Sequence, residues 1–209
     1  MSEPDATTHT ARGSWREFGS PDLPRPLLAA LEAFAERGYD GTSIREIATR
    51  AGLSVPGLYH YHASKQALLA DLMHRVMVDL LDRSHRALAE AGPSAGARFD
   101  AVVECLLRFH MYRREQAFVG STEIRSLEPE ARRSYIAQRD EQQAMVDAVV
   151  REGVESGEFH TDYPQDASRA VTTMCVAVAT WYRPDGGLSA DEIVRRYLTI
   201  ARAAVGAGG

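Results

Sequence analysis

The sequence lacks the features of several specialised protein classes. No apolar run approaches the ~20 residues that a helix needs to cross a bilayer, and the N-terminal stretch MSEPDATTHTARGSW has no basic region followed by an apolar one, unlike a secretion signal. Only two cysteines are present, Cys105 and Cys175, far apart and outside any paired metal-ligand spacing. We therefore expect a cytoplasmic protein in which both thiols are buried and reduced.

An excess of positive charge is also missing. The formal net charge is −5, Lys65 is the only lysine, and residues 1–75 carry eight basic side chains against nine acidic ones. This balance excludes a protein that holds nucleic acid by bulk electrostatics, which would be basic overall. Any contact with DNA must come from a few well-placed groups.

Strand patterns are absent, whereas helical periodicity recurs along the chain. Residues 1–20 are polar and predict a flexible tail, in which Arg12, Trp15 and Arg16 form an alternative arm toward a DNA minor groove. A first helix is expected from Leu23 to Arg37, with Asp22 as its N-cap and Gly38 at its end.

Three further helices follow closely. Thr42 or Ser43 caps the second, with Glu46 in capping-box spacing from Ser43. The third covers Ser54 to His60, and the fourth runs from Lys65 to about Ala89. Helical patterns then occupy 95–114, 115–127, 129–156, 165–183 and 189–205, separated by proline and glycine. The predicted fold is all-α with about nine helices: a tail (1–20), a helix-turn-helix domain (21–66), and a helical ligand-binding and dimerisation domain (67–209).

The segment from residue 41 to residue 69 has the spacing of a helix-turn-helix. Ala48, Ala51 and Gly52 let two helices approach closely, and Leu53 and Leu58 supply packing side chains. The third helix is too short to be stable alone, so tertiary contacts must hold it. Its N-terminus would then be available to base edges or phosphates in a major groove.

These residues resemble the DNA-binding domain of the TetR family of transcriptional regulators. The matching residues are FAERGY (34–39), TS (42–43), IA (47–48), AGLS (51–54), LY (58–59) and SK (64–65), followed by Leu68. The resemblance implies a DNA surface made of Thr42, Ser43, Arg45, Ser54, Val55, Pro56, Gly57, Tyr59, His60 and Lys65.

The resemblance also implies individual roles. The hydroxyl of Thr42 and the side chains of Tyr59 and Lys65 would contact phosphates, while residues 54–57 would face the groove floor with Arg45 and His60 at the flanks. In the alternatives, Thr42 only caps a helix, Tyr59 is a core aromatic, and Arg45 and Lys65 are solvated. The chain departs from the family pattern at His62, which takes a position usually filled by a packed aromatic. A metal site at His60 and His62 is disfavoured because no third ligand is near in sequence.

The last two helical segments predict a dimer interface. They carry Ala170, Val171, Met174, Ala177 and Val178 in one helix and Ile193, Val194, Tyr197, Leu198, Ile200 and Ala201 in the other. Two such helices from each protomer can form a four-helix bundle, as the corresponding pair does in the TetR family. The segment WYRPDGGL (181–188), with Glu192 and Tyr197, resembles the tail of a subset that controls sterol and fatty-acid breakdown and responds to acyl-CoA thioesters. In the alternative, Trp181 and Tyr182 are aromatics of the dimer core.

Apolar residues between the fourth helix and the dimer pair, with three from the first helix of that pair, predict an effector pocket, with plain core packing as the alternative. The candidates are Cys105, Phe109, Tyr112, Phe118, Ile124, Met145, Met174, Val178 and Trp181, and Tyr135 and Val149 share their apolar spacing. A group of arginines could meet the phosphates of coenzyme A: Arg108, Arg113, Arg114, Arg125, Arg132 and Arg133.

We therefore expect a regulator, most simply a repressor, that binds a palindromic double-stranded DNA operator as a homodimer. A small apolar or acyl-CoA-like effector would release it, with no membrane contact. The alternatives are an all-α acyl-CoA-binding protein or enzyme with a vestigial DNA-binding head, and an architectural DNA binder, which the acidic balance disfavours. The sequence predicts no catalytic residue, metal site or cofactor.

Overall fold

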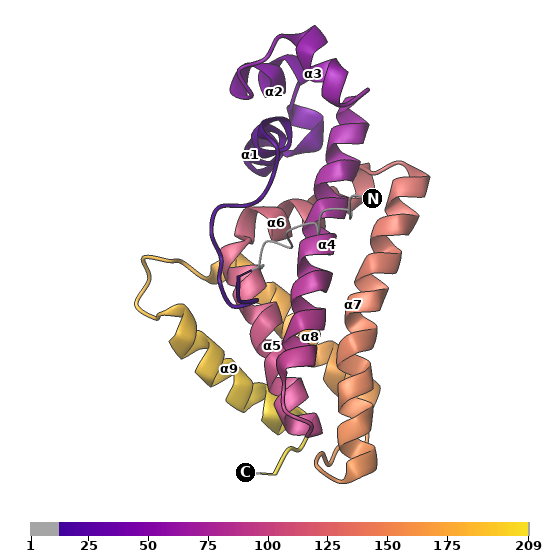
Figure 1. Ribbon diagram of the computed structural model, residues 1–209, viewed down its shortest axis with the longest axis vertical. Coiled ribbons are helices and arrows are strands. Elements are labelled where there is room, and N and C mark those ends of the chain that lie inside the picture. The colour runs from indigo at the N-terminus through magenta and orange to yellow at the C-terminus, as the bar shows by residue number, and fades with distance from the viewer. Residues whose placement is uncertain (1–12, 209) are drawn as a thin grey trace, which may run out of the picture.

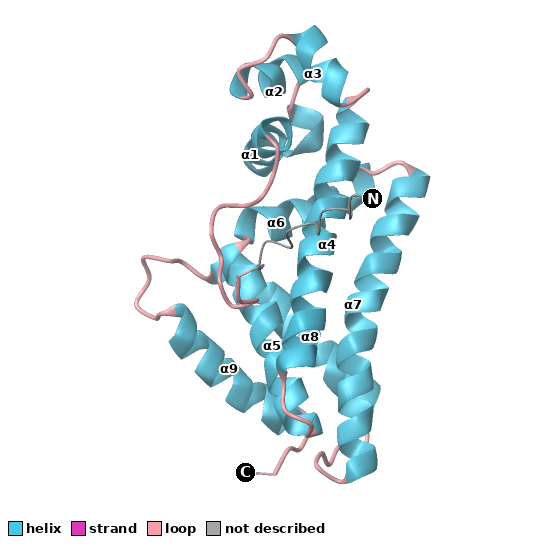
Figure 2. Cartoon of the chain, viewed as in Figure 1, coloured by secondary structure: helices cyan, strands magenta, loops and turns pink. Residues whose placement is uncertain are grey.

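The computed structural model describes residues 13–208, and within them the chain forms nine α-helices, one 3₁₀-helix and no strand (Figures 1 and 2). The elements are α1 (Arg25–Gly41), α2 (Ile44–Arg50), α3 (Val55–Tyr61), α4 (Lys65–Glu90), α5 (Ala95–Tyr112), α6 (Arg114–Thr122), η1 (Glu123–Ser126), α7 (Pro129–Ser156), α8 (Pro164–Trp181) and α9 (Ala190–Ala204). The all-α prediction is confirmed.

Serine side chains decide where several helices begin. Ser43, Ser54 and Ser64 each accept a hydrogen bond from the backbone N–H three residues later, at the starts of α2, α3 and α4. Ser94 and Ser189 do the same for α5 and α9. Because such caps are visible in sequence, the predicted helix starts lie close to the observed ones.

Two predicted caps are wrong. Pro24, and not Asp22, is the N-cap of α1, and no side chain caps that end. Glu46 does not complete a capping box with Ser43, because its carboxylate binds Arg37 and Arg50 instead. The break at Gly38 is where the sequence predicts it: this glycine has φ +71°, and the helical backbone is interrupted there.

Helices α1–α3 form a head at one end of the molecule, and the long helix α4 descends from it into the body made of α5–α9 (Figure 1). Helix α5 lies at the centre of the body and packs against α4, α7, α8 and α9, burying Phe99, Val102 and Leu106 completely. Helix α1 rests on α6, and the Gln66 side chain binds the backbone of Ser126 and Glu128. The head is therefore seated on the body.

The interior contains few titratable groups. His110 is buried, and burial lowers the pKa of its imidazole to about 4, so the ring is neutral near pH 7. Both cysteines are buried and free, as predicted, and burial raises the pKa of Cys105 to about 12. Over residues 13–208, none of the helices has the length and apolar character that a membrane crossing requires.

The N-terminal residues that the structure describes are not a solvated tail. Trp15 is 1% exposed and packs between α4 and α5. Arg16 forms an ion pair with Glu104 at 3.0 Å. The predictions of a flexible tail and of a minor-groove arm are therefore wrong for Trp15 and Arg16, and Arg12 lies outside the described residues.

Candidate nucleic-acid interface

The turn between α2 and α3 is closed by backbone hydrogen bonds. The N–H of Gly52 donates to the carbonyl of Thr49 at 3.1 Å, and that of Leu53 donates to Ala48 at 2.8 Å. Gly52 has φ +66°, a conformation that a side chain would strain. Leu58 is fully buried and holds α3 in place. This arrangement is the tight helix-turn-helix that the sequence predicts.

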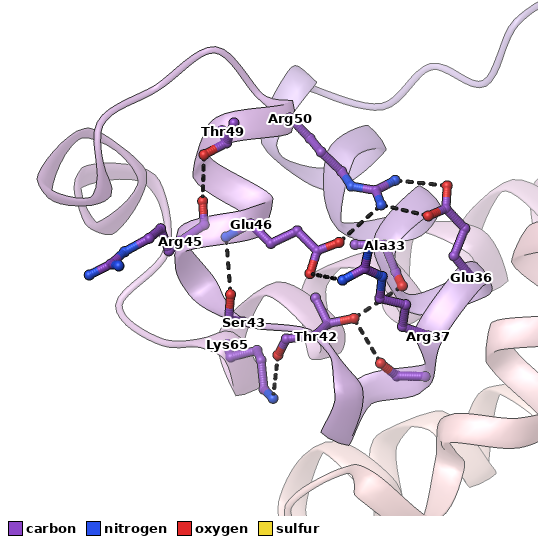
Figure 3. A network of polar contacts seen from close by, with 11 residues as sticks. Ala33, Glu36, Arg37, Thr42, Ser43, Arg45, Glu46, Thr49, Arg50 and Lys65 are labelled. Carbon is purple, nitrogen blue, oxygen red and sulfur yellow. Dashed lines mark hydrogen bonds and ion pairs between the residues drawn. The ribbon is translucent and has the colours of Figure 1, made fainter.

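A network of ion pairs locks α2 against α1 (Figure 3). Arg50 binds Glu36 at 2.5 Å and Glu46 at 3.0 Å, and Arg37 binds Glu46 at 3.4 Å. The hydrogen bond from Arg50 lowers the pKa of the Glu36 carboxyl group. Sequence reasoning missed this network, although the i,i+4 spacing of Glu46 and Arg50 was a usable signal.

The network also removes negative charge from the outer surface of the head. Between Ile44 and Ser64 the sequence contains one carboxylate, that of Glu46. Its oxygens are directed to Arg37 and Arg50 on the α1 side. The α2–α3 unit therefore presents no free carboxylate, so a polyanion can approach it although the whole chain is acidic.

Most of the predicted DNA-contacting side chains are exposed on this unit. Tyr59 is 47% exposed, and Arg45 projects away from the network in Figure 3, with no side-chain partner among the described residues. Ser43, Ser54, Pro56 and His60 are exposed as well, while Val55 and Gly57 are half-buried. The outer side of α3 is thus uncovered in the described chain.

Thr42 does not take the predicted role. Its side chain is 2% exposed, and its hydroxyl lies 3.0 Å from the carbonyl oxygen of Ala33 and 2.8 Å from that of Gly38. A hydroxyl in this position cannot reach a phosphate. Thr42 does not cap the start of α2, where Ser43 is the N-cap, but it is the C-cap residue of α1, with its backbone N–H bound to the carbonyl of Tyr39. Thr42 instead joins the end of α1 to the start of α2.

Lys65 has a structural role that the sequence did not reveal. Its ammonium donates to the carbonyl oxygens of Tyr39 and Thr42 at 2.8 and 2.9 Å, and lies 4.0 Å from the centre of the Tyr39 ring. These contacts tie the start of α4 to the turn between α1 and α2. A lysine has three N–H donors, so one remains for a phosphate.

His62 fills its unusual position by forming a polar pair. Its Nε2 lies 2.8 Å from a carboxylate oxygen of Asp71 on α4, and Arg75 binds the other oxygen at 2.8 Å. Burial favours a higher pKa for Asp71, but hydrogen bonds from His62 and Arg75 outweigh it and lower the pKa. The end of α3 is therefore joined to α4 by a hydrogen bond where the family pattern uses aromatic packing.

The nine candidate pocket residues do not line one cavity. Tyr112, Phe118 and Trp181 are 44%, 48% and 43% exposed. Cys105 is buried against Trp15, while Val178 belongs to the main core and Ile124 and Met174 pack against it. Met145 is half-buried on α7. Of the nine, only Phe109 lines one of the two hollows described below, and Tyr135, which shares their spacing, lines the other. Apolar spacing by itself does not distinguish the walls of a cavity from a filled core.

The two hollows lie on either side of α4. One, of about 260 Å³, lies between α4 and α7 and is lined by Ala70, Asp71, Met73, His74, Leu127, Ala131, Ser134, Tyr135 and Gln138. The other, of about 620 Å³, lies under the N-terminal residues 13–23 and is bounded by α4, Phe109, Arg113 and Gln116.

The six arginines predicted to bind coenzyme A phosphates do not form one cluster. Arg108 pairs with Glu104 and Asp191, Arg113 binds the carbonyl of Gly19, and Arg114 binds that of Ala179. The other three, Arg125, Arg132 and Arg133, are exposed near the start of α7 and have no side-chain partner among the described residues.

Helices α8 and α9 expose part of the predicted dimer surface. The predicted residues Ala170 and Ala177 on α8 and Ile200 on α9 are exposed, and so is Val176 on α8, which is not among the predicted residues. Other predicted interface residues are buried within the protomer, namely Val171, Val178, Ile193, Val194 and Ala201. The rings of Trp181 and Tyr197 pack 5.8 Å apart and join the two helices.

Comparison with known proteins gives consistent matches to both parts of the chain. Residues 27–72 match the model for bacterial regulatory proteins of the tetR family, and residues 92–205 match the tetracyclin repressor-like C-terminal domain. The HTH-type transcriptional repressor KstR2 of Mycobacterium tuberculosis is 31% identical over 176 residues, which are 83% of this chain and 88% of the relative.

Solved structures of related regulators have the same fold as this chain. The ketosteroid transcriptional regulator KstR2 of Mycobacterium tuberculosis has a TM-score of 0.81 at 25% identity, covering 91% of this chain and 98% of that one. A tetR-family regulatory protein from Rhodococcus RHA1 has a TM-score of 0.81 at 27% identity, covering 88% and 97%. AibR, in complex with isovaleryl coenzyme A and operator DNA, shares the fold, with a TM-score of 0.74 at 20% identity and coverage of 88% and 100%.

The burial of Thr42 predicts a structural role that is measurable without DNA. We expect Thr42→Val to lower the free energy of unfolding by about 1–2 kcal/mol, because buried carbonyl groups lose their donor. Thr49→Val is the matched control: Thr49 is exposed, with its hydroxyl bonded to the carbonyl of Arg45. Its effect should stay within about 0.5 kcal/mol. Urea denaturation measures both, and equal stabilities would contradict the assignment.

Proposed function

The chain belongs to the TetR family of bacterial regulatory proteins, and from this premise we propose that it is a homodimeric repressor that an acyl-CoA-like effector releases from operator DNA. The observation that carries the proposal is the uncovered α2–α3 surface, which has no free carboxylate and carries Arg45, Tyr59 and the exposed end of α3. A second function, as a carrier or enzyme, has no comparable feature in its favour.

The proposed DNA contacts divide into positioning and reading groups. Tyr59 and the third N–H of Lys65 would bind phosphates and position the head without carrying sequence information. The start of α3 would face the groove floor with Ser54, Val55, Pro56 and Gly57. These residues offer few hydrogen bonds to base edges, so we propose that methyl contacts and DNA shape contribute much of the specificity, with Arg45 and His60 at the flanks.

A single head buries too little surface for tight specific binding, so two heads would bind a two-fold operator. The exposed residues Ala170, Val176 and Ala177 of α8, with Ile200 of α9, support dimerisation through this pair of helices. Small side chains along α8 allow a second copy of the helix to approach closely. A four-helix bundle would then set the distance between the heads.

For the effector, we propose entry between α4 and α7. The hollow of about 260 Å³ opens there, and the free Arg132 and Arg133 flank its α7 side. Further along the same two helices, Gln142 of α7 accepts a hydrogen bond from Ser84 of α4; Gln142 is 4% exposed, and its amide nitrogen has no partner among the described residues. This nitrogen would donate to a thioester carbonyl, while the arginines would bind the phosphates of coenzyme A.

The ligand class is supported by the tail segment 181–188 and by KstR2, which is named as a ketosteroid regulator. The AibR complex holds both a coenzyme A thioester and DNA in the same fold. An effector can release DNA only if it binds more tightly to a conformation that misfits the operator. Because α4 joins the hollow to the head, separation of α4 from α7 would change the spacing of the two heads.

The DNA assignment predicts that Tyr59→Phe weakens binding to a fragment from beside the protein's own gene by about tenfold, through loss of one phosphate contact. The loss should be similar for the fragment and for base-substituted versions of it, as titrations by fluorescence anisotropy would show. Tyr163→Phe on the body is the control, because Tyr163 is 70% exposed and far from the head in sequence. A changed base preference at unchanged affinity would show that Tyr59 reads bases.

The dimer assignment predicts that Ala177→Glu converts the protein to a monomer, because two like charges would meet across the two-fold axis region without partners. Sedimentation equilibrium measures the mass directly. Ile136→Glu, on an exposed position of α7, should leave the mass unchanged. If both variants remain dimeric, α8 is not at the interface.

The effector assignment predicts that coenzyme A thioesters with apolar acyl groups bind and reduce DNA affinity, whereas free coenzyme A binds at least about tenfold more weakly. The double substitution Arg132→Ala and Arg133→Ala should weaken thioester binding, and Arg151→Ala, exposed near the other end of α7, should not. Calorimetry measures binding, and chromatography of the thioester tests for conversion. Turnover would support the enzyme alternative instead.

A further inference from the structure

The N-terminal segment of residues 13–22, here called the strap, crosses the body before the chain enters α1. In Figure 1 the indigo segment descends from α1 past α6 and reaches the region of α5. The strap precedes residue 27, where the family match of the head begins. It is therefore a feature of this chain that neither matched domain accounts for.

Trp15 anchors the strap. Its side chain is 1% exposed and packs against Ala87 of α4 and against Ala101 and Cys105 of α5. Indole is the largest side chain and gains most from leaving water. Burial of Trp15 between two helices of the body therefore fixes the strap to the body surface.

Three arginines reinforce this anchor by binding the strap backbone. Arg83 donates to the carbonyls of Trp15 and Glu17 at 2.9 Å, and Arg86 donates to that of Gly13 at 2.7 Å. Arg113 donates to the carbonyl of Gly19 at 2.9 Å. Every second carbonyl from residue 13 to residue 19 is thus bound by a charged donor, and such bonds are stronger than those between neutral groups.

Aromatic contacts complete the attachment. Phe18 stacks on Tyr112 with ring centres 5.0 Å apart, and the guanidinium of Arg83 lies 4.1 Å from the centre of the Phe18 ring. Arg16 pairs with Glu104 of α5. The strap therefore contacts α4 and α5 and the junction of α5 with α6.

The strap leads directly into the head. Only five residues separate Gly19, the last bound carbonyl, from Arg25 at the start of α1, and two of them are Pro21 and Pro24. Proline fixes φ, so this connector is stiff as well as short. A displacement of the bound strap must move the start of α1.

Helix α4 leaves the head at its other end and carries two of the arginines that bind the strap. The head is therefore held at both its beginning and its end by the same part of the body. Between Gly19 and α1 the strap bridges the hollow of about 620 Å³, so it has room to shift without unfolding a helix.

We infer that the strap, anchored by Trp15, is a second attachment of the head to the body and positions α1 against α4 and α6. Loss of the anchor frees the start of α1, although the hydrophobic core of the body stays intact. A change in the distance between α4 and α5 would then move the head through two connections, α4 and the strap.

Hydrogen exchange of the backbone amides tests this inference without DNA or effector, so its failure would leave the proposed repressor function untouched. In Trp15→Ala we expect exchange over the strap and the first two turns of α1 to be faster by roughly tenfold or more. Exchange in α7 and α8 should be unchanged, and Trp15→Phe should fall between the variant and the original chain. Tyr163→Ala, which removes an aromatic side chain that is 70% exposed, is the matched control and should behave as the original chain.

Arg83→Met provides a second variant, because it removes two bonds to the strap without opening the packing around Trp15. It should give the same pattern as Trp15→Ala, more weakly. Three results would overturn the inference: a freed strap with unchanged α1, no change in either segment, or an equal increase in α1, α7 and α8. The first would reduce the strap to a cover on the body, the second would show that Trp15 does not hold it, and the third would indicate general destabilisation.

Discussion

The head depends on one constraint: α3 has only seven residues, too few to remain helical in water, and every property of its outer surface requires that other elements hold it. Buried Leu58 fixes one side, the side chain of Ser54 satisfies the first turn, and the tight turn at Gly52 sets the angle to α2. Helix α2 is in turn locked to α1 by Arg50. The exposed surface of α3 is thus a product of contacts on its other side.

The same contacts reconcile an acidic chain with a surface suited to a polyanion. Two acids of the head, Glu36 and Glu46, are paired with Arg37 and Arg50 at the junction of α1 and α2. The other two, Glu32 and Asp40, lie on α1. Pairing neutralises Glu36 and Glu46, and their position keeps them away from the outer side of α3. Partly exposed ion pairs contribute little to stability. Their main effect here is to keep the negative charge of these carboxylates away from the outer side of α3.

Attachment of the head to the body uses polar side chains that are ordinary in sequence. Gln66 binds the corner before α7, Lys65 binds the turn after α1, and His62 binds Asp71 on α4. At the other end of the head, before α1, the strap is attached to the body by Trp15 and by the three arginines that bind its backbone. Because these bonds join rigid helices, a small rearrangement of α4 within the body would move the whole head, and the proposed regulation rests on this coupling.

The sequence by itself determined the helices, the helix-turn-helix and the family. Helical periodicity, serine caps and the turns at Gly38 and Gly52 all depend on interactions between residues only three to five positions apart. Only the tertiary structure decided that Thr42 and Trp15 are buried, that Lys65 binds backbone carbonyls, and that the nine apolar candidates fill a core or lie at the surface instead of lining one cavity. Those outcomes depend on tertiary contacts, such as Trp15 with Cys105 or Thr42 with Ala33. Local patterns in the sequence do not show which separate segments will make such contacts.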